Sequence, residues 1–507
     1  MPTDDPLILA IDAGSSSVRA TIHDGCGRPV DGLEARRPYQ FATTSDGGVE
    51  VGADALFKLV VEAIDEILLR SGRRRGGISA VAMSTFWHNL VGVDAEGRAL
   101  TPVYSWADTR SAAAAEELRG LVDESRYHAR TGCPLHPSYL PAKLLWLYRS
   151  RPELFRGTSR WMSFGEYAYL KLFGVNRCSL SMASGTGLLD QDRLEWDEGI
   201  LQVLPLERNQ LSPLIDLDAP LSGLAPSFAG RWPDLRKIPW AAAVGDGACS
   251  NVGSGCCTPD RLALMVGTSG AMRVMGKTDQ PSVPRGLWCY RANRSRFVMG
   301  GSLSNGGLLF EWMTETLRLE RDPQAVERGL AEMAPDSHGL TLLPFLAGER
   351  SPGWQSKARA AVTGLSLHTR PIEILRASLE SVAYRFAMIA RLLEPVVPED
   401  REILASGGAL LPSPVWMQIM ADVLGQPVAA SAVKEASSRG AALLALEALG
   451  FLDGIEEVAT PLGARFDPDP ERHERYRQGL ERHDRLYRLL LPQPANRPGR
   501  PDSEQGF

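Results

Sequence analysis

The stretch LILAIDAGSSS at residues 7–17 decides the fold, because an apolar run with strand character leads directly into a tight Gly-Ser turn. A second stretch, LALMVGTSG at residues 262–270, repeats this arrangement about half a chain later. Each predicts a strand, a turn and a returning strand, the latter over residues 18–23 and 271–275. Glycine lets the backbone approach an anion closely, and small hydroxyl residues add hydrogen-bond donors. Two such turns could therefore hold one polyphosphate from opposite sides.

Each turn alone is more often an ordinary hairpin than a phosphate loop, so the hypothesis depends on their pairing. The pairing favours an ATP-dependent enzyme on a duplicated α/β fold, although no repeat is visible at residue level. The residues expected to contact phosphate are Gly14, Ser15, Ser16, Gly267, Thr268 and Ser269.

Two aspartates accompany the turns. Asp12 immediately precedes the first turn, and Asp246, within VGDGA at residues 244–248, precedes the second. A carboxylate beside a phosphate site repels the anion unless a metal or a proton-transfer role compensates. The alternative for Asp246 is an ordinary Asp-Gly turn.

Composition limits the class of protein. The 507 residues are 44% hydrophobic and 23% charged, which is typical of a soluble globular protein with two large domains. The formal net charge of −6 argues against general nucleic-acid binding. The 7 cysteines include no CxxC pair, and no apolar run or signal peptide indicates a membrane or secretion. We therefore expect a cytoplasmic protein that binds neither nucleic acid nor membrane.

Apolar periodicity predicts the elements around the turns. Helices are expected at residues 53–69, 111–121, 141–148, 303–316, 371–393, 415–424 and 437–450, and strands at 78–84, 90–93 and 401–406. The helix starts at 111 and 371 are assigned to capping by Asp108-Thr109 and by Thr369. The Gly- and Ser-rich segment 248–257 predicts a domain boundary, and residues 491–507, rich in Pro and Arg, predict a disordered tail.

Several short motifs, taken in this order, resemble the FGGY family of carbohydrate kinases over nearly the whole chain. They are IDAGSSS (11–17), YSWADTR (104–110), VGDGA (244–248), MVGTSGAMRV (265–274), LAGERSPGW (346–354), SGGA (406–409) and WMQIMADVLG (416–425). The resemblance implies an α/β fold of two actin-like, ribonuclease-H-like domains, at residues 1–250 and 251–490, with the active site in the cleft between them. It implies ATP and Mg²⁺ as cofactors, a sugar or sugar acid as substrate and, by analogy alone, a homodimer.

The resemblance also assigns roles to the aspartates. Asp246 matches the catalytic base, which accepts the proton of the sugar hydroxyl as its oxygen attacks the γ-phosphate. Flanking Gly245 and Gly247 would let the substrate approach closely. Asp12 matches the residue that holds Mg²⁺ near the β- and γ-phosphates.

Residues after the strand at 401–406 are expected to bind adenosine. Gly407 and Gly408 would lie flat against adenine or ribose, and Ser413 and Gln418 follow on the next loop and helix. Glycerol kinases in this family tend to carry Asn where this chain has Ser413. For Gln418 and its helix-face neighbour Asp422, a solvated or capping role stays open.

The sugar is expected to contact Trp87, His88, Asp108 and His136, besides Asp246. For the histidines the alternative is a satisfied structural role. Family members usually carry a small residue or Met where this chain has Trp87, so the indole could narrow the pocket.

The substrate implied first is D-gluconate, phosphorylated by ATP to 6-phosphogluconate. The segment GCPLHP at 132–137 and Arg273 are most similar to gluconokinases, whereas the Arg-Glu pair of glycerol kinases near residues 87–88 is absent. Arg273, Arg350 or Lys143 could meet the carboxylate, and the sequence does not choose among them. The alternatives are a xylulokinase-like, ribulokinase-like or other polyol kinase and, from other classes, a non-catalytic ATP-binding sugar sensor or an actin-like scaffold.

Overall fold

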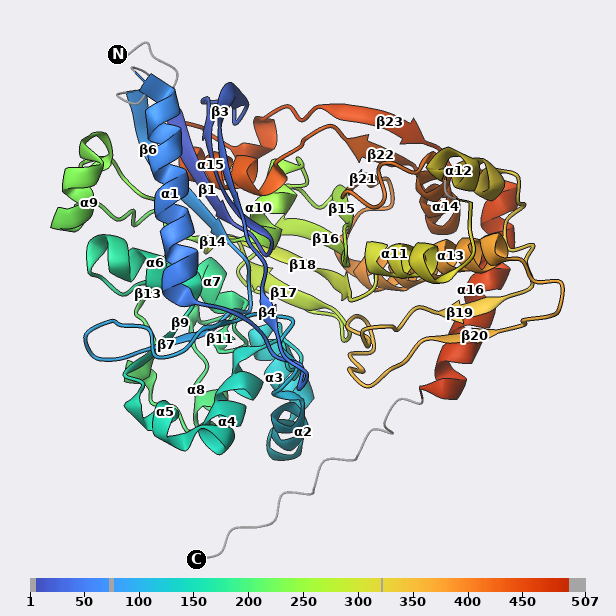
Figure 1. Ribbon diagram of the computed structural model, residues 1–507, viewed down its shortest axis with the longest axis horizontal. Coiled ribbons are helices and arrows are strands. Elements are labelled where there is room, and N and C mark those ends of the chain that lie inside the picture. The colour runs from blue at the N-terminus through green and yellow to red at the C-terminus, as the bar shows by residue number, and fades with distance from the viewer. Residues whose placement is uncertain (1–5, 73–76, 321, 492–507) are drawn as a thin grey trace, which may run out of the picture.

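The computed structural model describes residues 6–72, 77–320 and 322–491. Two mixed sheets form its two halves, and Figure 1 shows the blue and green first half beside the yellow, orange and red second half. Most of the expected tail, from residue 492 onward, lies outside the described residues. Leu491, by contrast, is partly buried and donates its backbone N–H to the carbonyl of Tyr487, so placing this residue in a disordered tail is wrong.

The first sheet confirms the strand–turn–strand prediction at residues 7–23. Its order is β14-β6-β1-β2-β3, with β1 antiparallel to β2, β2 antiparallel to β3, and β1, β6 and β14 parallel. The strands are β1 (Leu7–Ala13), β2 (Ser17–His23), β3 (Pro29–Pro38), β6 (Ile78–Thr85) and β14 (Val244–Gly245). β1 is apolar and almost fully buried, because both faces of the sheet are covered.

The second sheet repeats this order and confirms the duplication. Its order is β17-β18-β16-β15-β21-β22-β23, in which β18-β16-β15-β21-β22 has the same relative directions as the first sheet listed from its other edge, β3-β2-β1-β6-β14. The strands are β15 (Arg261–Val266), β16 (Gly270–Lys277), β17 (Trp288–Arg291), β18 (Arg296–Leu303), β21 (Glu402–Ser406), β22 (Val428–Ser431) and β23 (Leu462–Phe466). An edge strand on each side, β17 and β23, is added to the shared core.

Helices cover the sheets, and short strands build the insertions between them. The helices are α1 (Ala53–Ser71), α2 (Ala112–Leu121), α3 (Glu124–Thr131), α4 (Leu140–Ser150), α5 (Pro152–Gly157), α6 (Phe164–Phe173), α7 (Leu180–Ser184), α8 (Glu198–Leu201), α9 (Pro226–Arg231), α10 (Asp246–Gly253), α11 (Gly307–Thr316), α12 (Pro323–Ala331), α13 (Pro371–Leu393), α14 (Pro414–Leu424), α15 (Ala436–Ala448) and α16 (Pro470–Leu490). The short strands are β4 (Ala42–Thr43), β5 (Val49–Val51), β7 (Val91–Val93), β8 (Val103–Tyr104), β9 (Arg160–Met162), β10 (Cys178–Ser179), β11 (Leu189–Asp190), β12 (Glu195–Trp196), β13 (Leu214–Ile215), β19 (Thr341–Leu343) and β20 (Ala361–Thr363).

The predicted helices are confirmed, but one of their starts and two of their assigned caps are wrong. Residue 303 ends β18, and α11 begins only at Gly307. The N-cap of α13 is Arg370, whose backbone N–H is bound by Glu373, so Thr369 does not cap it. α2 begins after Ser111 with no side-chain cap. Local propensity locates a helix well, whereas its first residue depends on neighbours that periodicity does not show.

Helix α15 belongs to the second half of the chain but packs against the first sheet and α10, where Figure 1 shows it among the blue strands. The crossing is very tight. A Cβ on Gly253 would lie 1.8 Å from the carbonyl oxygen of Ala436, and one on Gly440 would lie 1.8 Å from that of Cys249. The segment expected to be a domain boundary is therefore helical as far as Gly253, and the division at residue 250 stays a prediction. No helix within residues 6–72, 77–320 and 322–491 has the length and apolarity needed to cross a bilayer.

Candidate active site

Two carboxylates meet at the carboxyl end of the first sheet. In the register of β1, β6 and β14, Asp12 pairs with Ser84, and Ser84 pairs with Val244 on its other side. Asp246 follows two residues later as the first residue of α10. Parallel strands bring their carboxyl ends to one edge, so these two residues, far apart in sequence, lie on one side of the sheet.

Asp12 is a buried acid with an unusual environment. Burial raises its pKa to about 7, the charge of Asp246 adds to the rise, and Arg19 opposes it. Arg19 Nη1 lies 3.5 Å from Asp12 Oδ2 and 2.8 Å from Glu435 Oε2, so it links Asp12 to the start of α15. Oδ1 of Asp12 is buried without a hydrogen-bond partner among the described residues. A buried carboxylate oxygen left in this way fits a cation ligand.

Asp246 is held by its own helix turn and by a cation. Its Oδ1 accepts the backbone N–H of Gly247 at 2.8 Å, and Arg273 Nη1 donates to the carbonyl of Gly247, also at 2.8 Å. Burial raises the pKa of Asp246, while Arg273 and the backbone N–H groups of Gly247 and Trp87 hold it down. The result is a carboxylate that is more basic than usual, which suits a general base.

The glycines beside Asp246 have a different purpose from the one expected. A Cβ on Gly245 would lie 1.9 Å from the indole of Trp87, and one on Gly247 would lie 2.6 Å from it. The glycines therefore make room for Trp87 rather than for substrate. Trp87 is 5% exposed and donates Nε1–H to the carbonyl of Ser181 at 3.0 Å, so its ring supports the backbone around Asp246.

His88 has a strained backbone conformation, and a hydrogen bond fixes its ring. Its φ is +58°, in the left-handed region, and its Nδ1 bonds the carbonyl of Gly185. A carbonyl only accepts, so Nδ1 carries the proton and Nε2 is left as an acceptor. Burial lowers the pKa of His88 to about 3, with Arg350 acting in the same direction, so the imidazole is neutral.

His136 shows the opposite tautomer. Its Nδ1 accepts the backbone N–H of Ser138 at 3.2 Å, which places the proton on Nε2. Burial, reinforced by Arg350, lowers the pKa of His136 well below its ordinary value. The ring centroids of His136 and Trp354 are 5.2 Å apart. The Tyr139 centroid lies 6.2 Å from that of Trp354 and 4.8 Å from that of His88. These ring contacts bring both predicted histidines into one aromatic cluster.

Lys143 and Asp108 are committed to the fold. Lys143 Nζ donates to the carbonyls of Pro137 at 2.6 Å and Ser138 at 2.8 Å, and burial lowers its pKa to about 7. Asp108 accepts the backbone N–H of Val49 at 3.2 Å and pairs with the guanidinium of Arg110. Both side chains are thus engaged by the protein itself, and a sugar contact for Asp108 stays a prediction.

In the first turn the serine side chains are exposed, and two backbone carbonyls accept hydrogen bonds from the protein. Ser15 and Ser16 are exposed. Tyr39 donates its hydroxyl to the carbonyl of Gly14 at 2.5 Å and its N–H to that of Ser16 at 3.0 Å. Both carbonyls are thereby occupied by one residue, which leaves the turn's own hydroxyl donors free for an anion.

The second turn is built by glycines from three segments. The carbonyl of Gly267 accepts from Gly307, and that of Thr268 accepts from Gly306 at the start of α11. A Cβ on Gly307 would lie 2.6 Å from the carbonyl oxygen of Gly267. Gly407, with a φ of +104°, would place a Cβ 2.2 Å from the carbonyl oxygen of Val266. The structure thus brings the predicted phosphate turn and the predicted adenosine loop together.

Two predicted adenosine contacts are occupied by the protein itself. The hydroxyl of Ser413 caps α14 and donates to Glu327 at 2.9 Å. Gln418 Nε2 donates to Asp422 Oδ1 and to the carbonyl of Asp467, both at 2.8 Å. Their observed contacts support the structural alternative, and their contact with nucleotide stays a prediction.

Some residues near the two turns were not indicated by the sequence, because they contact partners that lie far away in the chain. They are Arg19, Tyr39, Gly306, Gly307 and Glu435. The run NGG at 305–307 was the available signal, but the predicted helix from residue 303 hid it.

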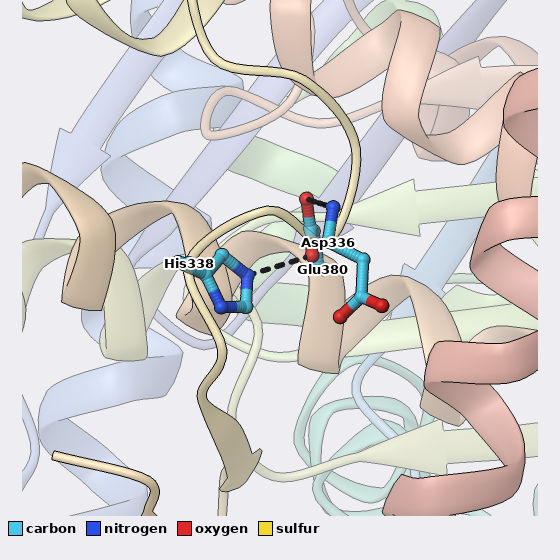
Figure 2. A group of neighbouring side chains, drawn as sticks. All are labelled: Asp336, His338 and Glu380. Carbon is cyan, nitrogen blue, oxygen red and sulfur yellow. Dashed lines mark hydrogen bonds and ion pairs between the residues drawn. The ribbon is translucent and has the colours of Figure 1, made fainter.

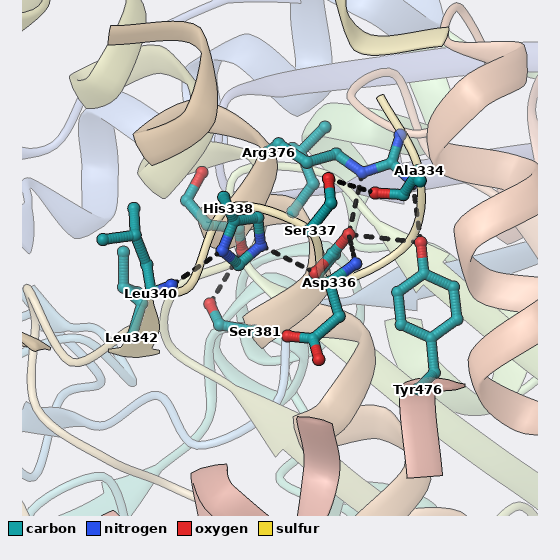
Figure 3. A network of polar contacts seen from close by, with 12 residues as sticks. Ala334, Asp336, Ser337, His338, Leu340, Leu342, Arg376, Ser381 and Tyr476 are labelled. Atoms are coloured by element: carbon teal, nitrogen blue, oxygen red, sulfur yellow. Dashed lines mark hydrogen bonds and ion pairs between the residues drawn. The ribbon is translucent and has the colours of Figure 1, made fainter. Parts of the chain in front are cut away.

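A separate acid–histidine cluster lies between α13 and α16. Figure 2 shows Asp336, His338 and Glu380, whose potential ligand atoms lie within 4.8 Å of one another. Figure 3 shows that His338, Arg376 and Tyr476 belong to a network of polar contacts within the protein. Glu380 accepts from His338 at 2.9 Å and from Arg376 at 2.8 Å, and Asp336 pairs with Arg482. His338 Nδ1 also accepts the N–H of Leu340. The cluster is therefore an ion-pair network that joins these helices.

The chain is similar to known proteins over nearly its whole length. The chain is 28% identical over 496 residues to the gluconokinase of Bacillus subtilis (strain 168), covering 96% of this chain and 94% of that protein. It is 29% identical over 483 residues to the glycerol kinase of Citrifermentans bemidjiense, covering 92% and 95%. The crystal structure of gluconate kinase from Lactobacillus acidophilus superimposes with a TM-score of 0.89 at 26% identity, covering 97% and 99%.

The family assignment does not depend on any one of these relatives. Residues 7–253 match the N-terminal domain, and residues 262–449 the C-terminal domain, of the FGGY family of carbohydrate kinases. The fold is the two-domain, actin-like α/β fold of these kinases, as expected from the motifs. The chain belongs to the FGGY family of carbohydrate kinases and is, with them, an ATP-dependent sugar kinase.

Proposed function

We propose that this kinase phosphorylates D-gluconate to 6-phosphogluconate, with Asp246 as the catalytic base. The observation that carries the catalytic role is the position of Asp246. It lies beside Asp12 at the carboxyl edge of the first sheet, with a raised pKa and a neighbouring cation. Relatives with different substrate names lie at nearly equal identity, so the substrate is chosen on the chemistry of the site.

In the proposed reaction, the Asp246 carboxylate and the two turns act together. Asp246 accepts the proton of the sugar hydroxyl as that oxygen attacks the γ-phosphate of ATP, and ADP leaves. The turns at 14–16 and 267–269 orient the phosphates through hydroxyl and backbone donors. In this proposal the donors supply positioning and charge neutralisation, which dominate phosphoryl transfer.

Asp12 is proposed to hold Mg²⁺. Its Oδ1 has no protein donor among the described residues, and carboxylate oxygens are the ligands that Mg²⁺ prefers. When bound there, the ion would neutralise phosphate charge. Arg19 keeps Oδ2 occupied, so it orients the carboxylate.

The adenosine is proposed to lie against Gly407 and Gly408. A Cβ on Gly408 would meet no atom within 4 Å, so its backbone faces open space, while Gly407 is pressed against the end of β15. Close backbone approach to a flat base needs this absence of side chains.

Gluconate is favoured by the sign of the charge near the histidines. Burial and then the charge of Arg350 lower the pKa of both His88 and His136, so the two imidazoles are neutral and Arg350 is the cation that acts most strongly on both. A carboxylate-bearing polyol balances this positive potential, whereas a ketose such as xylulose does not. Neutral His88 and His136 offer one acceptor and one donor to hydroxyl groups.

The test is ADP release with Mg-ATP against gluconate, xylulose, ribulose, glycerol, erythritol and fuculose. We expect saturable turnover with gluconate at a kcat/KM at least ~30-fold above that of the neutral compounds. Preference for a neutral sugar would keep the kinase and overturn gluconate. No turnover, with ATP still bound, would favour the sensor.

A further inference from the structure

We propose that Arg350 binds the carboxylate of the substrate, so that this kinase selects open-chain sugar acids over neutral polyols. The inference rests on the proposed function and identifies the specificity-determining residue of that site. The sequence left Arg273, Lys143 and Arg350 as equal candidates, and their contacts now separate them.

Two of the three cations are already used. Lys143 donates to two carbonyl oxygens within 2.8 Å and is buried at the start of α4. Arg273 donates to the carbonyl of Gly247 and its charge faces Asp246. A ligand carboxylate would have to displace a structural contact at either position.

Arg350 has no such partner. Within the described part of the chain, its side chain forms no ion pair, and its buried Nε has no hydrogen-bond partner. A partly buried guanidinium without a counter-ion is unfavourable unless something compensates. Its guanidinium lies 5.3 Å from the Trp106 ring and 5.9 Å from the Trp354 ring, which compensates only in part.

The surroundings of Arg350 are those of the proposed sugar site. Trp354, one of the rings beneath it, contacts His136. The charge of Arg350 acts on His88, His136 and Asp246, which places it within electrostatic reach of the proposed base. A linear substrate with a hydroxyl at one end and a carboxylate at the other matches this arrangement of base, neutral imidazoles and cation.

The loop that carries Arg350 is fixed by its neighbours. Glu349 is buried and pairs with Arg385, and it also accepts the hydroxyl of Tyr487 at 2.9 Å. Ser351 donates its N–H to the carbonyl of Ser302 at 2.9 Å, and Trp354 donates Nε1–H to that of Gly286 at 2.9 Å. The guanidinium is therefore presented from a rigid segment, which favours specific recognition of an anion.

The γ-phosphate of ATP is the other anion that could meet this guanidinium. The two sources differ in what they predict. A carboxylate partner makes the effect of Arg350 depend on the charge of the sugar, whereas a phosphate partner makes it appear with every substrate and in the KM for ATP.

The experiment compares the wild-type enzyme with Arg350→Met, Arg350→Lys and the control Lys357→Met. Lys357 is an exposed cation on the same segment, so the control removes the same charge at a distance from the site. Each protein is assayed with Mg-ATP and either D-gluconate or D-gluconamide, which replaces the carboxylate by a neutral amide.

For Arg350→Met we expect the KM for gluconate to rise by about 30-fold or more, with kcat at saturation changed by less than about threefold. The KM for gluconamide and the KM for ATP should stay within about threefold of wild type, and Arg350→Lys should recover part of the gluconate affinity. Lys357→Met should behave as wild type, and the melting temperature of Arg350→Met should not fall.

Several results would overturn the inference. An unchanged KM for gluconate in Arg350→Met, with the wild type active on gluconate, would reject Arg350 and leave the proposed function standing. Equal losses on gluconate and gluconamide, or a raised KM for ATP, would assign the guanidinium to phosphate. A wild-type enzyme that uses neutral sugars and no acid, tested also with galactonate, xylonate and glucuronate, would reject both proposals.

Discussion

The two glycine turns occupy equivalent places in the two sheets, yet they are built differently. The first, at residues 14–16, adjoins Asp12, and its carbonyls are held by Tyr39. The second, at residues 267–269, is enclosed by Gly307 and Gly407. The first turn thus has a carboxylate at its side, whereas the second is closely packed against backbone from two other segments. This difference agrees with our proposal that the first half supplies the reacting groups and the second half the nucleotide site.

The largest effect is expected at Asp246, the proposed base in the first half. Asp246→Asn removes the proton acceptor but keeps the size and the hydrogen bond to Gly247, so kcat should fall by roughly 100-fold or more. ATP affinity, measured by calorimetry, should be unchanged. Turnover within a few-fold of wild type would exclude Asp246 as the base.

The next effect tests the second turn as a ligand surface. Gly267 has only Met265 Sδ, at 3.7 Å, near a Cβ position, so the fold accepts a side chain there. Gly267→Val should therefore keep its melting temperature but weaken ATP binding by at least about tenfold, because the side chain fills the phosphate position.

Gly230→Val is the control for this substitution, because Gly230 is exposed on α9 with open space around it. It should bind ATP normally. Unchanged ATP affinity in Gly267→Val would reduce the second turn to a structural hairpin.

A third, smaller effect compares what two adjacent glycines, Gly407 and Gly408, contribute to the stability of the fold. Gly407 is in the left-handed region and would place a Cβ 2.2 Å from the Val266 carbonyl, whereas Gly408 has open space. Gly407→Ala should lower the free energy of unfolding by about 1–3 kcal/mol, and Gly408→Ala should change it little. Denaturant titration of both variants provides the comparison, and equal stability would contradict the packing described for the second turn.

The smallest effect concerns pH. Arg273 lowers the pKa of Asp246, so Arg273→Gln, which keeps a donor but removes the charge, should raise it. Asp246 acts when deprotonated, so activity is lost as pH falls through this pKa. The acid limb of the kcat/KM profile should therefore move to higher pH in the variant. A limb that stays in place or moves to lower pH would show that another group controls it.

The fold was predictable from the sequence to a large extent, and the site only in part. The apolar runs before residues 14 and 267 predicted both hairpins, because burial on two faces leaves a continuous hydrophobic signal. Asp12, Asp246, His88 and the turns each belong to a local motif, and the structure places Asp12 and Asp246 at one edge of the first sheet, while their roles stay predictions. The role of Gly245 was wrong, because its need for glycine comes from the Trp87 ring, more than a hundred residues earlier in the chain.

Other contacts of the site residues could not be predicted for the same reason. The backbone N–H of Val49 that binds Asp108, and the Glu327 carboxylate that binds Ser413, lie far away in the sequence, so local motifs do not indicate these contacts. Tyr39 and Arg19 reach the site through contacts between separate strands and helices. Side chains that act across long sequence separations require the three-dimensional arrangement.

The central claim is that Asp246 and the two turns act on one phosphate and one hydroxyl. The most direct measurement is a crystal structure with Mg²⁺, gluconate and a non-hydrolysable ATP analogue. We predict that the γ-phosphate lies between residues 14–16 and 267–269, with the acceptor hydroxyl within hydrogen-bond distance of Asp246. An acceptor hydroxyl away from Asp246, or phosphates that contact only one turn, would contradict it.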